Sequence, residues 1–317
     1  MKTNRITALA LFLALLGSTA CAAAEKNATN TVTITVIELK GNPSGSQDVG
    51  LNEGLKRYMS QDGKENVDVK IVTVDRKKAL KDSKYKGLNL DYMPLYLMEK
   101  NKFTEEKFGD AIKYGQLKEH GNFIVFEKQT GKGVDLSKKA IPNQLDVFVM
   151  SQCPYGVIAE NKLIEAIKQN KMPKNVKVNI RYIVSGDATN GFSSLHGSGE
   201  WEEDVRQLIV KKYAPEKFWK YLELRNKDYH SSLWSDIAEQ AGVDPSIFKK
   251  YWKEGMKMLE EEVKYSDENG INSSPTVIWE GRVKTNMNDL AKIPGFEGLA
   301  EVKDNNGNAA AQPTGSC

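Results

Sequence analysis

The segment 150–156, MSQCPYG, places a cysteine where its thiol could react. Cys153 follows an apolar run typical of a buried strand and precedes a segment with helical periodicity, so the thiol is expected at a helix N-terminus. Unpaired backbone N–H groups and the helix dipole stabilise a thiolate at that position, and the thiolate is the nucleophilic form. The sequence therefore predicts that Cys153 is a nucleophile.

Gly156 stands three residues after Cys153, where a dithiol site would carry its second cysteine. A second thiol would resolve a mixed disulfide formed on Cys153, and a glycine cannot. The other cysteines of the sequence are Cys21 and Cys317. Cys317 lies in a low-complexity segment that could fold back on Cys153 as a resolving thiol or crosslink two chains. A terminal cysteine without a role is an equally good interpretation.

A second motif lies far along the chain in INSSPTVIW, where Ser274, Pro275 and Thr276 precede an apolar strand. Together with DVFVMSQCPYGVIAENKL, this motif resembles the thioredoxin superfamily and, within it, the DsbA-like branch, over residues 143–300. The resemblance implies that Pro275 is a cis-proline whose loop positions an extended substrate chain beside Cys153.

The rest of the active-site motif fits this resemblance. Pro154 suits the first turn of a helix, because it has no N–H to leave unpaired. Tyr155 could flank a substrate groove. The DsbA-like branch also implies a helical insertion, which the periodicity of the sequence places at about residues 193–268.

The order of expected elements indicates an α/β fold made of two tandem thioredoxin-like domains. Strands over 31–41 and 67–75, with a helix over 48–59 between them, open a first domain at 31–130 that lacks redox cysteines. Met93-Pro94 marks either a second cis-proline or a plain turn into a strand. A boundary is expected at 135–144, then the second domain with its inserted helical subdomain, and a disordered tail over 301–317.

Residues 1–24 have the pattern of a signal peptide, with a basic start, a short apolar stretch and small residues before Glu25. Cleavage after Ala24 would release a soluble protein, and this is the favoured interpretation. In the alternative, STAC is a lipobox and Cys21 is lipidated. The protein is thus expected to be exported, periplasmic or extracellular, and membrane-anchored only if Cys21 carries lipid.

The bulk composition excludes several kinds of partner. The 317 residues are 27% charged and 40% hydrophobic, and the formal net charge is +3, so nucleic acid is not an expected partner. His120 and His230 have no metal-ligand spacing, and neither a metal nor a cofactor is predicted. His196 is more typical of a loop or capping histidine than of a catalytic one.

Two hypotheses of different classes follow. In the first, the chain is a thiol–disulfide exchange protein, a monothiol isomerase or reductase, that acts on cysteine-containing proteins through Cys153 and is reset by a small thiol or a redox partner protein. In the second, both domains form a non-catalytic binding or scaffold protein. The absence of a cysteine at Gly156 and throughout the first domain favours the second hypothesis.

Overall fold

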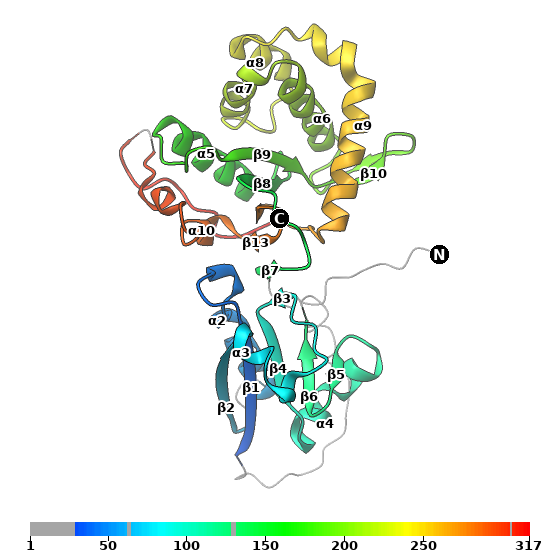
Figure 1. The fold of residues 1–317 in the computed structure, drawn as a ribbon. Coiled ribbons are helices and arrows are strands. Elements are labelled where there is room, and N and C mark those ends of the chain that lie inside the picture. The colour runs from blue at the N-terminus through cyan, green and yellow to red at the C-terminus, as the bar shows by residue number, and fades with distance from the viewer. Residues whose placement is uncertain (1–28, 62–64, 128–130, 305) are drawn as a thin grey trace. The chain divides into compact units, whose positions relative to one another are not determined.

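The computed structural model describes residues 29–61, 65–127, 131–304 and 306–317. It divides into two compact units, unit 1 at residues 1–138 and unit 2 at residues 139–317 (Figure 1). This division falls inside the segment 135–144 that the sequence marks as a boundary. The expected signal peptide and Cys21 lie outside the described residues.

Unit 1 begins with a strand, a helix and a second strand, as the alternating apolar pattern predicts. Its described elements are β1 (Asn30–Glu38), a 3-10 turn (Pro43–Gly45), α2 (Val49–Met59), β2 (Val67–Asp75), α3 (Arg76–Ala79), a 3-10 turn (Ser83–Tyr85), β3 (Tyr92–Met93), β4 (Leu95–Glu99), α4 (Lys102–Lys113), β5 (Lys118–His120), β6 (Phe123–Phe126) and β7 (Gly133–Asp135). The predicted strand 67–75 is confirmed, and the predicted helix at 48–59 forms with Asp48 as its N-cap.

The five-stranded sheet of unit 1 has the order β2-β1-β4-β6-β5. Strand β1 is parallel to β2 and antiparallel to β4, and β6 is antiparallel to β4. The peptide bond between Met93 and Pro94, just before β4, is cis. Helix α4 stands between β4 and the β5–β6 pair, where the sequence analysis placed no helix.

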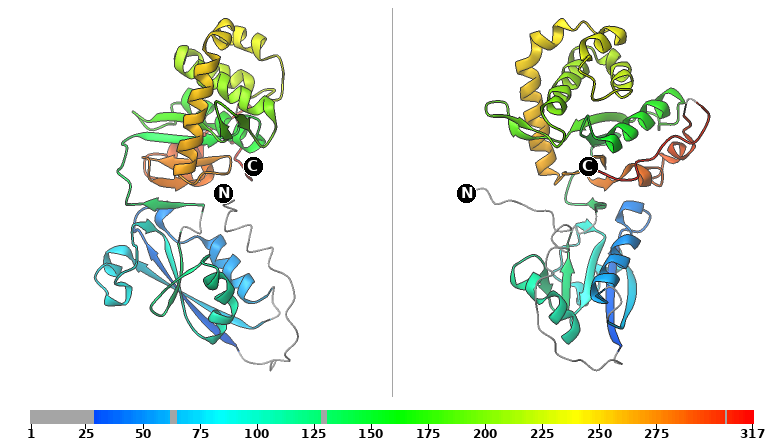
Figure 2. Two further views of the ribbon diagram at one scale, coloured as in Figure 1. Left: turned by 90° about the vertical axis from the view of Figure 1, so that its right-hand side faces the viewer. Right: turned by 180° about the vertical axis from the view of Figure 1, so that it is seen from behind.

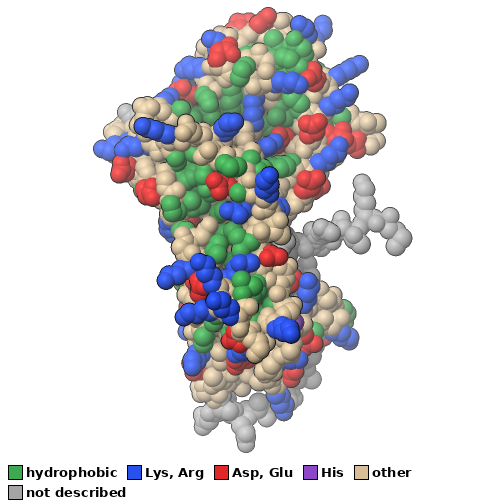
Figure 3. Space-filling model, in the orientation of Figure 1, with side chains coloured by type: hydrophobic (Ala, Val, Ile, Leu, Met, Phe, Trp, Pro, Cys, Tyr) green, Lys and Arg blue, Asp and Glu red, His purple; other side chains and the backbone are tan. Residues whose placement is uncertain are grey.

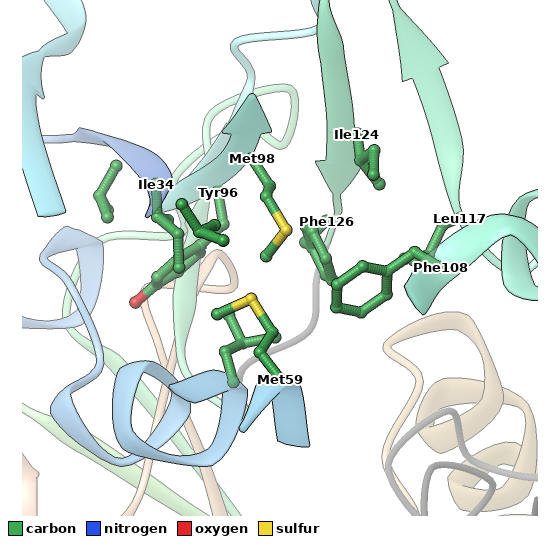
Figure 4. Packing of buried hydrophobic residues seen from close by; sticks show 11 residues of the cluster. Ile34, Met59, Tyr96, Met98, Phe108, Leu117, Ile124 and Phe126 are labelled. Atoms are coloured by element: carbon green, nitrogen blue, oxygen red, sulfur yellow. The ribbon is translucent and has the colours of Figure 1, made fainter. Parts of the chain in front are cut away.

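Two apolar clusters cover the faces of this sheet because alternate side chains of each strand point to opposite sides. On one face, residues of β1, β4 and β6 pack against α2 and α4, and Figure 4 shows Met59 and Phe108 reaching the strand residues from these helices. The opposite face is covered by the segments that contain Ala79, Tyr85 and Leu90. Unit 1 therefore has a core of its own.

Unit 2 repeats the strand–helix–strand beginning and then inserts helices. Its described elements are β8 (Gln144–Val149), α5 (Pro154–Lys168), β9 (Lys177–Tyr182), β10 (Ser185–Asp187), β11 (Gly191–Ser193), α6 (Ser198–Tyr213), a 3-10 turn (Pro215–Lys217), α7 (Phe218–Arg225), α8 (Trp234–Ala241), α9 (Ser246–Glu268), β12 (Thr276–Trp279), β13 (Val283–Thr285), α10 (Met287–Leu290) and a 3-10 segment (Glu297–Glu301).

Within unit 2 the strands lie in the order β13-β12-β8-β9. Strand β8 is parallel to β9 and antiparallel to β12, and β12 is antiparallel to β13. The four strands β2, β1, β4 and β6 of unit 1 have the same order and directions. The two units thus share a strand plan, and differ in that β12 and β13 form a direct hairpin whereas α4 and β5 separate β4 from β6.

The insertion in unit 2 follows β9 and consists of a small hairpin, β10–β11, and the helices α6 to α9. Helix α9 packs along α6 (Figure 2). Its N-cap is Pro245, and the carboxylate of Asp244 just before it accepts hydrogen bonds from the Ser246 N–H and hydroxyl. Acidic and basic side chains are interspersed on the visible face of unit 2 (Figure 3), as the near-neutral net charge indicates.

The terminal segment differs from the disordered tail expected over 301–317. Residues 297–301 form a 3-10 segment, Lys303 and Ala309 form an isolated antiparallel bridge, and the chain then runs back to the end marked C in Figure 1. Low complexity predicted disorder because the segment offers few apolar side chains. Its placement rests instead on backbone hydrogen bonds and on a covalent bond, which composition does not reveal.

Candidate active site

Cys153 is the N-cap residue of α5 and ends the short turn that follows β8. Pro154 occupies the first helical turn, where the proline ring fixes a helical φ and no N–H is lost. The Cys153 N–H donates to the Met150 carbonyl at 2.9 Å, and its own carbonyl accepts the first helical hydrogen bond, from Val157. The cysteine side chain is fully buried. The positive end of a fifteen-residue helix therefore faces the sulfur.

The loop before β12 lies against this helix start. The Ser274–Pro275 peptide bond is cis. Ser274 is fully buried, its hydroxyl oxygen accepts the Met150 N–H at 3.0 Å, and its carbonyl oxygen lies 3.6 Å from the Cys153 sulfur. Thr276 closes the loop by donating its hydroxyl to the Ser273 carbonyl at 2.7 Å. Two motifs separated by 121 positions thus meet at one thiol.

Cys317 is bonded to Cys153. The two residues form a disulfide within the chain, with their Cα atoms 6.1 Å apart. Cys317 also exchanges two backbone hydrogen bonds with Ser274, its N–H donating at 2.9 Å and its carbonyl accepting at 3.2 Å. A reciprocal pair of this kind is the unit of an antiparallel ladder. The segment that carries Cys317 therefore folds back on Cys153 within the chain.

The residues before Cys317 meet side chains of unit 2 at every second position. Pro313 is buried, whereas Thr314, Gly315 and Ser316 are exposed, and a Cβ atom on Gly315 would lie 2.7 Å from the ring of Tyr155. The Pro313 carbonyl accepts a hydrogen bond from the Asn288 side chain at 2.8 Å. This period of two is that of an extended strand bound along one side. We call residues Tyr155, Ser274, Asn288 and Cys153 the tail-binding surface.

Gly156 is packed too tightly to be exchanged for another residue without adjustment. A Cβ atom at this position would lie 2.6 Å from the Ser274 hydroxyl oxygen and 3.2 Å from the Met150 carbonyl oxygen. The hydroxyl is itself held by its hydrogen bond to Met150. The space that a second cysteine of a dithiol motif would need is thus occupied by the cis-proline loop.

The turn that carries Cys153 is also held from the insertion. Glu200, fully buried in the first turn of α6, accepts the Gln152 N–H at 3.0 Å, and its carbonyl accepts the Ser151 hydroxyl at 3.2 Å. The His196 Nδ1 atom lies 2.7 Å from the same carboxylate oxygen of Glu200. His196 therefore supports a buried acid beside the turn, and Glu200 is a site residue that the sequence analysis missed, because nothing in GEWEED distinguishes a buried glutamate from a solvated one.

A second buried acid lies on α5 itself. Glu160 is 1% exposed and accepts a hydrogen bond from the Asn226 side chain at 3.0 Å. Burial, reinforced by the nearby Glu203, raises the pKa of Glu160 to about 8 against the opposing effect of Asn226. This carboxyl is consequently protonated at neutral pH, so it adds no charge to the helix that carries Cys153.

Within the described residues, no group of three or more His, Cys, Asp or Glu side chains is arranged to hold a metal ion. Among the helices in the described ranges, none is both long and apolar enough to cross a bilayer.

No protein-family profile matches the chain, and no curated protein matches it. Several solved structures resemble part of it. ScsC from Proteus mirabilis aligns at 17% identity over 50% of this chain and 68% of its own, with a TM-score of 0.38. A periplasmic thioredoxin-like protein from Salmonella enterica aligns at 18% identity over 50% and 86%, with a TM-score of 0.37. The thiol-disulfide exchange protein alpha-DsbA2 from Wolbachia pipientis aligns at 15% identity over 59% and 90%, with a TM-score of 0.37.

Unit 2 contains the parts that the sequence led us to expect: a cysteine at the start of α5, a helical insertion after β9, and a proline in a cis bond before β12.

Proposed function

We propose that this chain is an exported thiol–disulfide exchange protein in which Cys153 is the nucleophile and Cys317 the resolving thiol. One observation carries the proposal. Cys153, at the start of a long helix and beside Pro275, is bonded to Cys317, which reaches it from a segment 164 residues away. The two thiols together can exchange a pair of electrons, a reaction for which Gly156 provides no second sulfur.

Cys153 and Cys317 together supply the two electrons that reduction of one substrate disulfide requires. In the reducing direction, the Cys153 thiolate attacks one sulfur of a substrate disulfide, and the other substrate sulfur leaves as a thiolate. The Cys317 thiolate then attacks Cys153, forms the intrachain disulfide and releases the second substrate thiolate, and solvent protonates both leaving groups. The substrate gains two electrons and two protons, and the protein loses them. A small thiol or a redox partner protein returns the pair to the dithiol form.

The disulfide partner of Cys153 supports the catalytic role. Cys153 is buried in an apolar cluster of the domain that includes Phe148 and Met150, but its partner Cys317 belongs to the tail that packs against this cluster. Helix α5 supplies backbone N–H groups that stabilise the thiolate once the tail is released. We therefore expect Cys153 in the reduced protein to react with iodoacetamide with an apparent pKa below the value of about 8.5 for a free thiol.

Two single variants test the division of roles. Reduced wild-type protein should catalyse the reduction of insulin by dithiothreitol, and Cys153→Ser should abolish the catalysis. Cys317→Ser should still attack glutathione disulfide but stop there, so that mass spectrometry finds one glutathione on Cys153. If Cys317→Ser turns over like the wild type and carries no adduct, Cys317 is not the resolving thiol. A Cys153 that alkylates no faster than a free thiol would refute the catalytic proposal altogether.

The substrates we propose are cysteine-containing proteins outside the cytoplasm. Export is supported by the signal-peptide pattern of residues 1–24. One of the similar solved structures is described as periplasmic, which agrees with this location. Whether the mature protein is released or anchored through Cys21 is tested by mass spectrometry of its N-terminus, since a lipidated Cys21 would carry the mass of its acyl chains.

Unit 1 favours a second role, that of a binding domain without redox chemistry. Its strand plan and its cis Met93–Pro94 bond support a thioredoxin-like domain, and it contains no cysteine after Cys21. A cavity of about 510 Å³ opens at the ends of β1 and β2, lined by residues that include Glu38, Lys40 and Asn42. Full-length Cys153→Ser should then still bind an unfolded cysteine-free protein, and a loss of that binding on substitution at Cys153 would exclude the role.

A further inference from the structure

We propose that the tail-binding surface selects glycine two residues before the cysteine of an extended substrate segment, and that residues 313–317 compete with such segments for this surface. This inference rests on the proposed role of Cys153 as nucleophile. The partner is a peptide in extended conformation. Its backbone pairs with Ser274, and this pairing places its cysteine next to Cys153.

The tail is itself a peptide bound to the surface. The backbone of Cys317 exchanges two N–H···O hydrogen bonds with Ser274, at 2.9 and 3.2 Å. These hydrogen bonds involve no side-chain atom, and the disulfide involves only the sulfur of Cys317. Any extended chain offers the same N–H and carbonyl groups, which is how strand addition provides affinity. The contact between Cys317 and Ser274 is therefore available to a segment of another protein, and the selection must come from neighbouring positions.

Tyr155 supplies the selection at the second position before the cysteine. A Cβ atom on Gly315 would lie 2.7 to 3.0 Å from three atoms of the Tyr155 phenol. Any other residue at this point requires the ring to move, and a β-branched residue requires the largest movement. Pro313, two positions further back, is buried, and its carbonyl accepts the Asn288 amide hydrogen at 2.8 Å. Thr314 and Gly315 are both exposed, so the contact with the Tyr155 ring is what distinguishes the two positions, and we expect no selection at Thr314.

The same contacts predict competition. The tail is tethered to unit 2, so its local concentration near Ser274 exceeds that of a free peptide, and the surface remains covered until the tail is displaced. Reduction of the disulfide removes the covalent part of this hold and leaves the backbone bonds. A substitution in the tail that weakens its contact with the surface should therefore speed the reaction of Cys153 with a free peptide. The same substitution in the peptide should slow that reaction.

The peptide half of the test uses full-length Cys317→Ser protein and the peptides AQPTGSC, AQPTVSC and AQPVGSC, each activated as a mixed disulfide with thionitrobenzoate. The Cys153 thiolate attacks the peptide sulfur, a new disulfide forms, and coloured thionitrobenzoate leaves with the electron pair. Valine in place of glycine should lower the rate constant by about three- to tenfold, toward the low end of overpacking effects because Gly315 is exposed and it meets only the outer end of the Tyr155 side chain. Valine in place of the exposed threonine is the matched control and should change the rate less than about twofold.

The protein half makes the same changes in the tail. Gly315→Val in the Cys317→Ser background should raise the rate constant with AQPTGSC, because it displaces the competitor, and Thr314→Val should leave the rate unchanged. Tyr155→Ala should reduce the difference between AQPTGSC and AQPTVSC. The opposite signs expected for one change in the peptide and in the protein distinguish competition for a surface from a general effect on the thiol.

The outcomes separate this inference from the proposed function. If the Cys317→Ser protein fails to react even with glutathione activated by thionitrobenzoate, Cys153 is not a nucleophile and the proposed function fails. If it reacts with that small disulfide but the three peptides give equal rate constants, the function stands and the selection by Tyr155 is refuted. Equal rates for the Gly315→Val and Thr314→Val proteins would refute competition by the tail.

Discussion

A Cβ atom on Gly156 would stand 2.6 Å from the hydroxyl oxygen of Ser274, which is fully buried. The hydroxyl cannot simply turn away, because it accepts the Met150 N–H at 3.0 Å. The Ser274 hydroxyl thus fills the space that a side chain at position 156 would need. Restoring a cysteine at position 156 would require a change at Ser274 as well.

We expect Gly156→Ala to lower the free energy of unfolding of unit 2 by about 1–3 kcal/mol, the cost of an overpacked site that also strains a buried hydrogen bond. All five tryptophans of the chain lie in unit 2, so tryptophan fluorescence during urea unfolding reports this unit alone. Gly199→Ala is the matched control, since its Cβ would meet only the Gln152 side chain at 3.4 Å, and it should cause no loss.

Ser274→Ala is the second single variant of a double-mutant cycle with Gly156→Ala. By itself it leaves the Met150 N–H without an acceptor and should cost about 1–3 kcal/mol. In combination with Gly156→Ala it removes the clash, so the double variant should be more stable than the sum of the single changes indicates. Strictly additive effects would show that the two residues do not compete for the same space.

Reduction of the Cys153–Cys317 disulfide should destabilise unit 2. A crosslink that spans 164 residues restricts the unfolded chain by about 5 kcal/mol in the chain-entropy description, and measured values run from about 2 to 5 kcal/mol. The stabilisation of the Cys153 thiolate by α5 opposes this but is smaller, about 1–2 kcal/mol. We therefore expect the oxidised form to be the more stable one in urea unfolding with and without dithiothreitol.

The expected difference in stability between the oxidised and reduced forms also predicts the direction of electron flow. A disulfide that stabilises the folded protein has a low reduction potential, by about 30 mV for every 1.4 kcal/mol, and its dithiol form is a reductant. The expected sign therefore favours a reductase or isomerase. Cys317→Ser should have the stability of the reduced protein and should not respond to dithiothreitol. If the reduced wild type proves the more stable form, the protein is instead a disulfide donor.

Much of the fold could be predicted from local pattern. The strand at 67–75 and the helix capped by Asp48 have clear periodicity and cap chemistry, and Cys153 was identified from the residues around it. Pro275 was identified from the family resemblance of the motif that contains it. Helix α4 was missed because its sequence follows the apolar strand β4 without a Gly or Pro break, although Asn101 and Thr104 form a capping box at its start.

The rest of the site depends on contacts between distant residues, which no local pattern encodes. Ser274 leaves no room for a side chain at position 156, and Glu200 holds the turn before Cys153 by accepting the Gln152 N–H. The docked tail had one signal in the sequence, the spacing of Pro313, Gly315 and Cys317 at every second position. That signal has meaning only once a partner for an extended strand is known.

Arg225 is a buried charge whose partner should matter for stability. Its side chain is 2% exposed, and its Nε atom lies 3.0 Å from a carboxylate oxygen of Glu203, which is 1% exposed. Arg225→Ala would remove the nearer of the two cations of this buried carboxylate and leave Arg206, whose Nη1 atom lies 3.4 Å from the other oxygen, so the loss should stay below the roughly 3–5 kcal/mol of a fully broken buried pair. Urea unfolding followed by tryptophan fluorescence measures it.

The surface pair between Lys264 and Glu260 on α9 is the matched control for Arg225. Both groups are solvated, so Lys264→Ala should shift the unfolding midpoint little. The double variant Arg225→Met with Glu203→Gln removes both buried charges and should cost less than the two single changes together. A double variant as unstable as that sum would show that the pair is not coupled.

Glu160 should make unit 2 less stable as the pH rises from about 5 to 8. Its pKa in the folded protein is raised to about 8, chiefly by burial, whereas in the unfolded chain it is near the ordinary value of about 4.3. Between these values the folded state holds a proton that the unfolded state has lost, so stability falls with rising pH, by up to about 1.4 kcal/mol per pH unit. Below the unfolded pKa the group is protonated in both states and contributes no slope.

Glu160→Gln keeps an uncharged side chain that can still accept the Asn226 hydrogen bond, so it should flatten this slope and raise stability most at pH 8. Part of the slope should remain, because burial also raises the pKa of Asp204. Glu301→Gln is the control: a hydrogen bond from Lys171 lowers the pKa of Glu301, which stays ionised in both states above pH 5, so its slope should equal that of the wild type. An unchanged slope in Glu160→Gln, measured by urea unfolding at pH 5.5 and pH 8, would mean that Glu160 ionises within the folded unit and that the helix carrying Cys153 bears a charge at neutral pH.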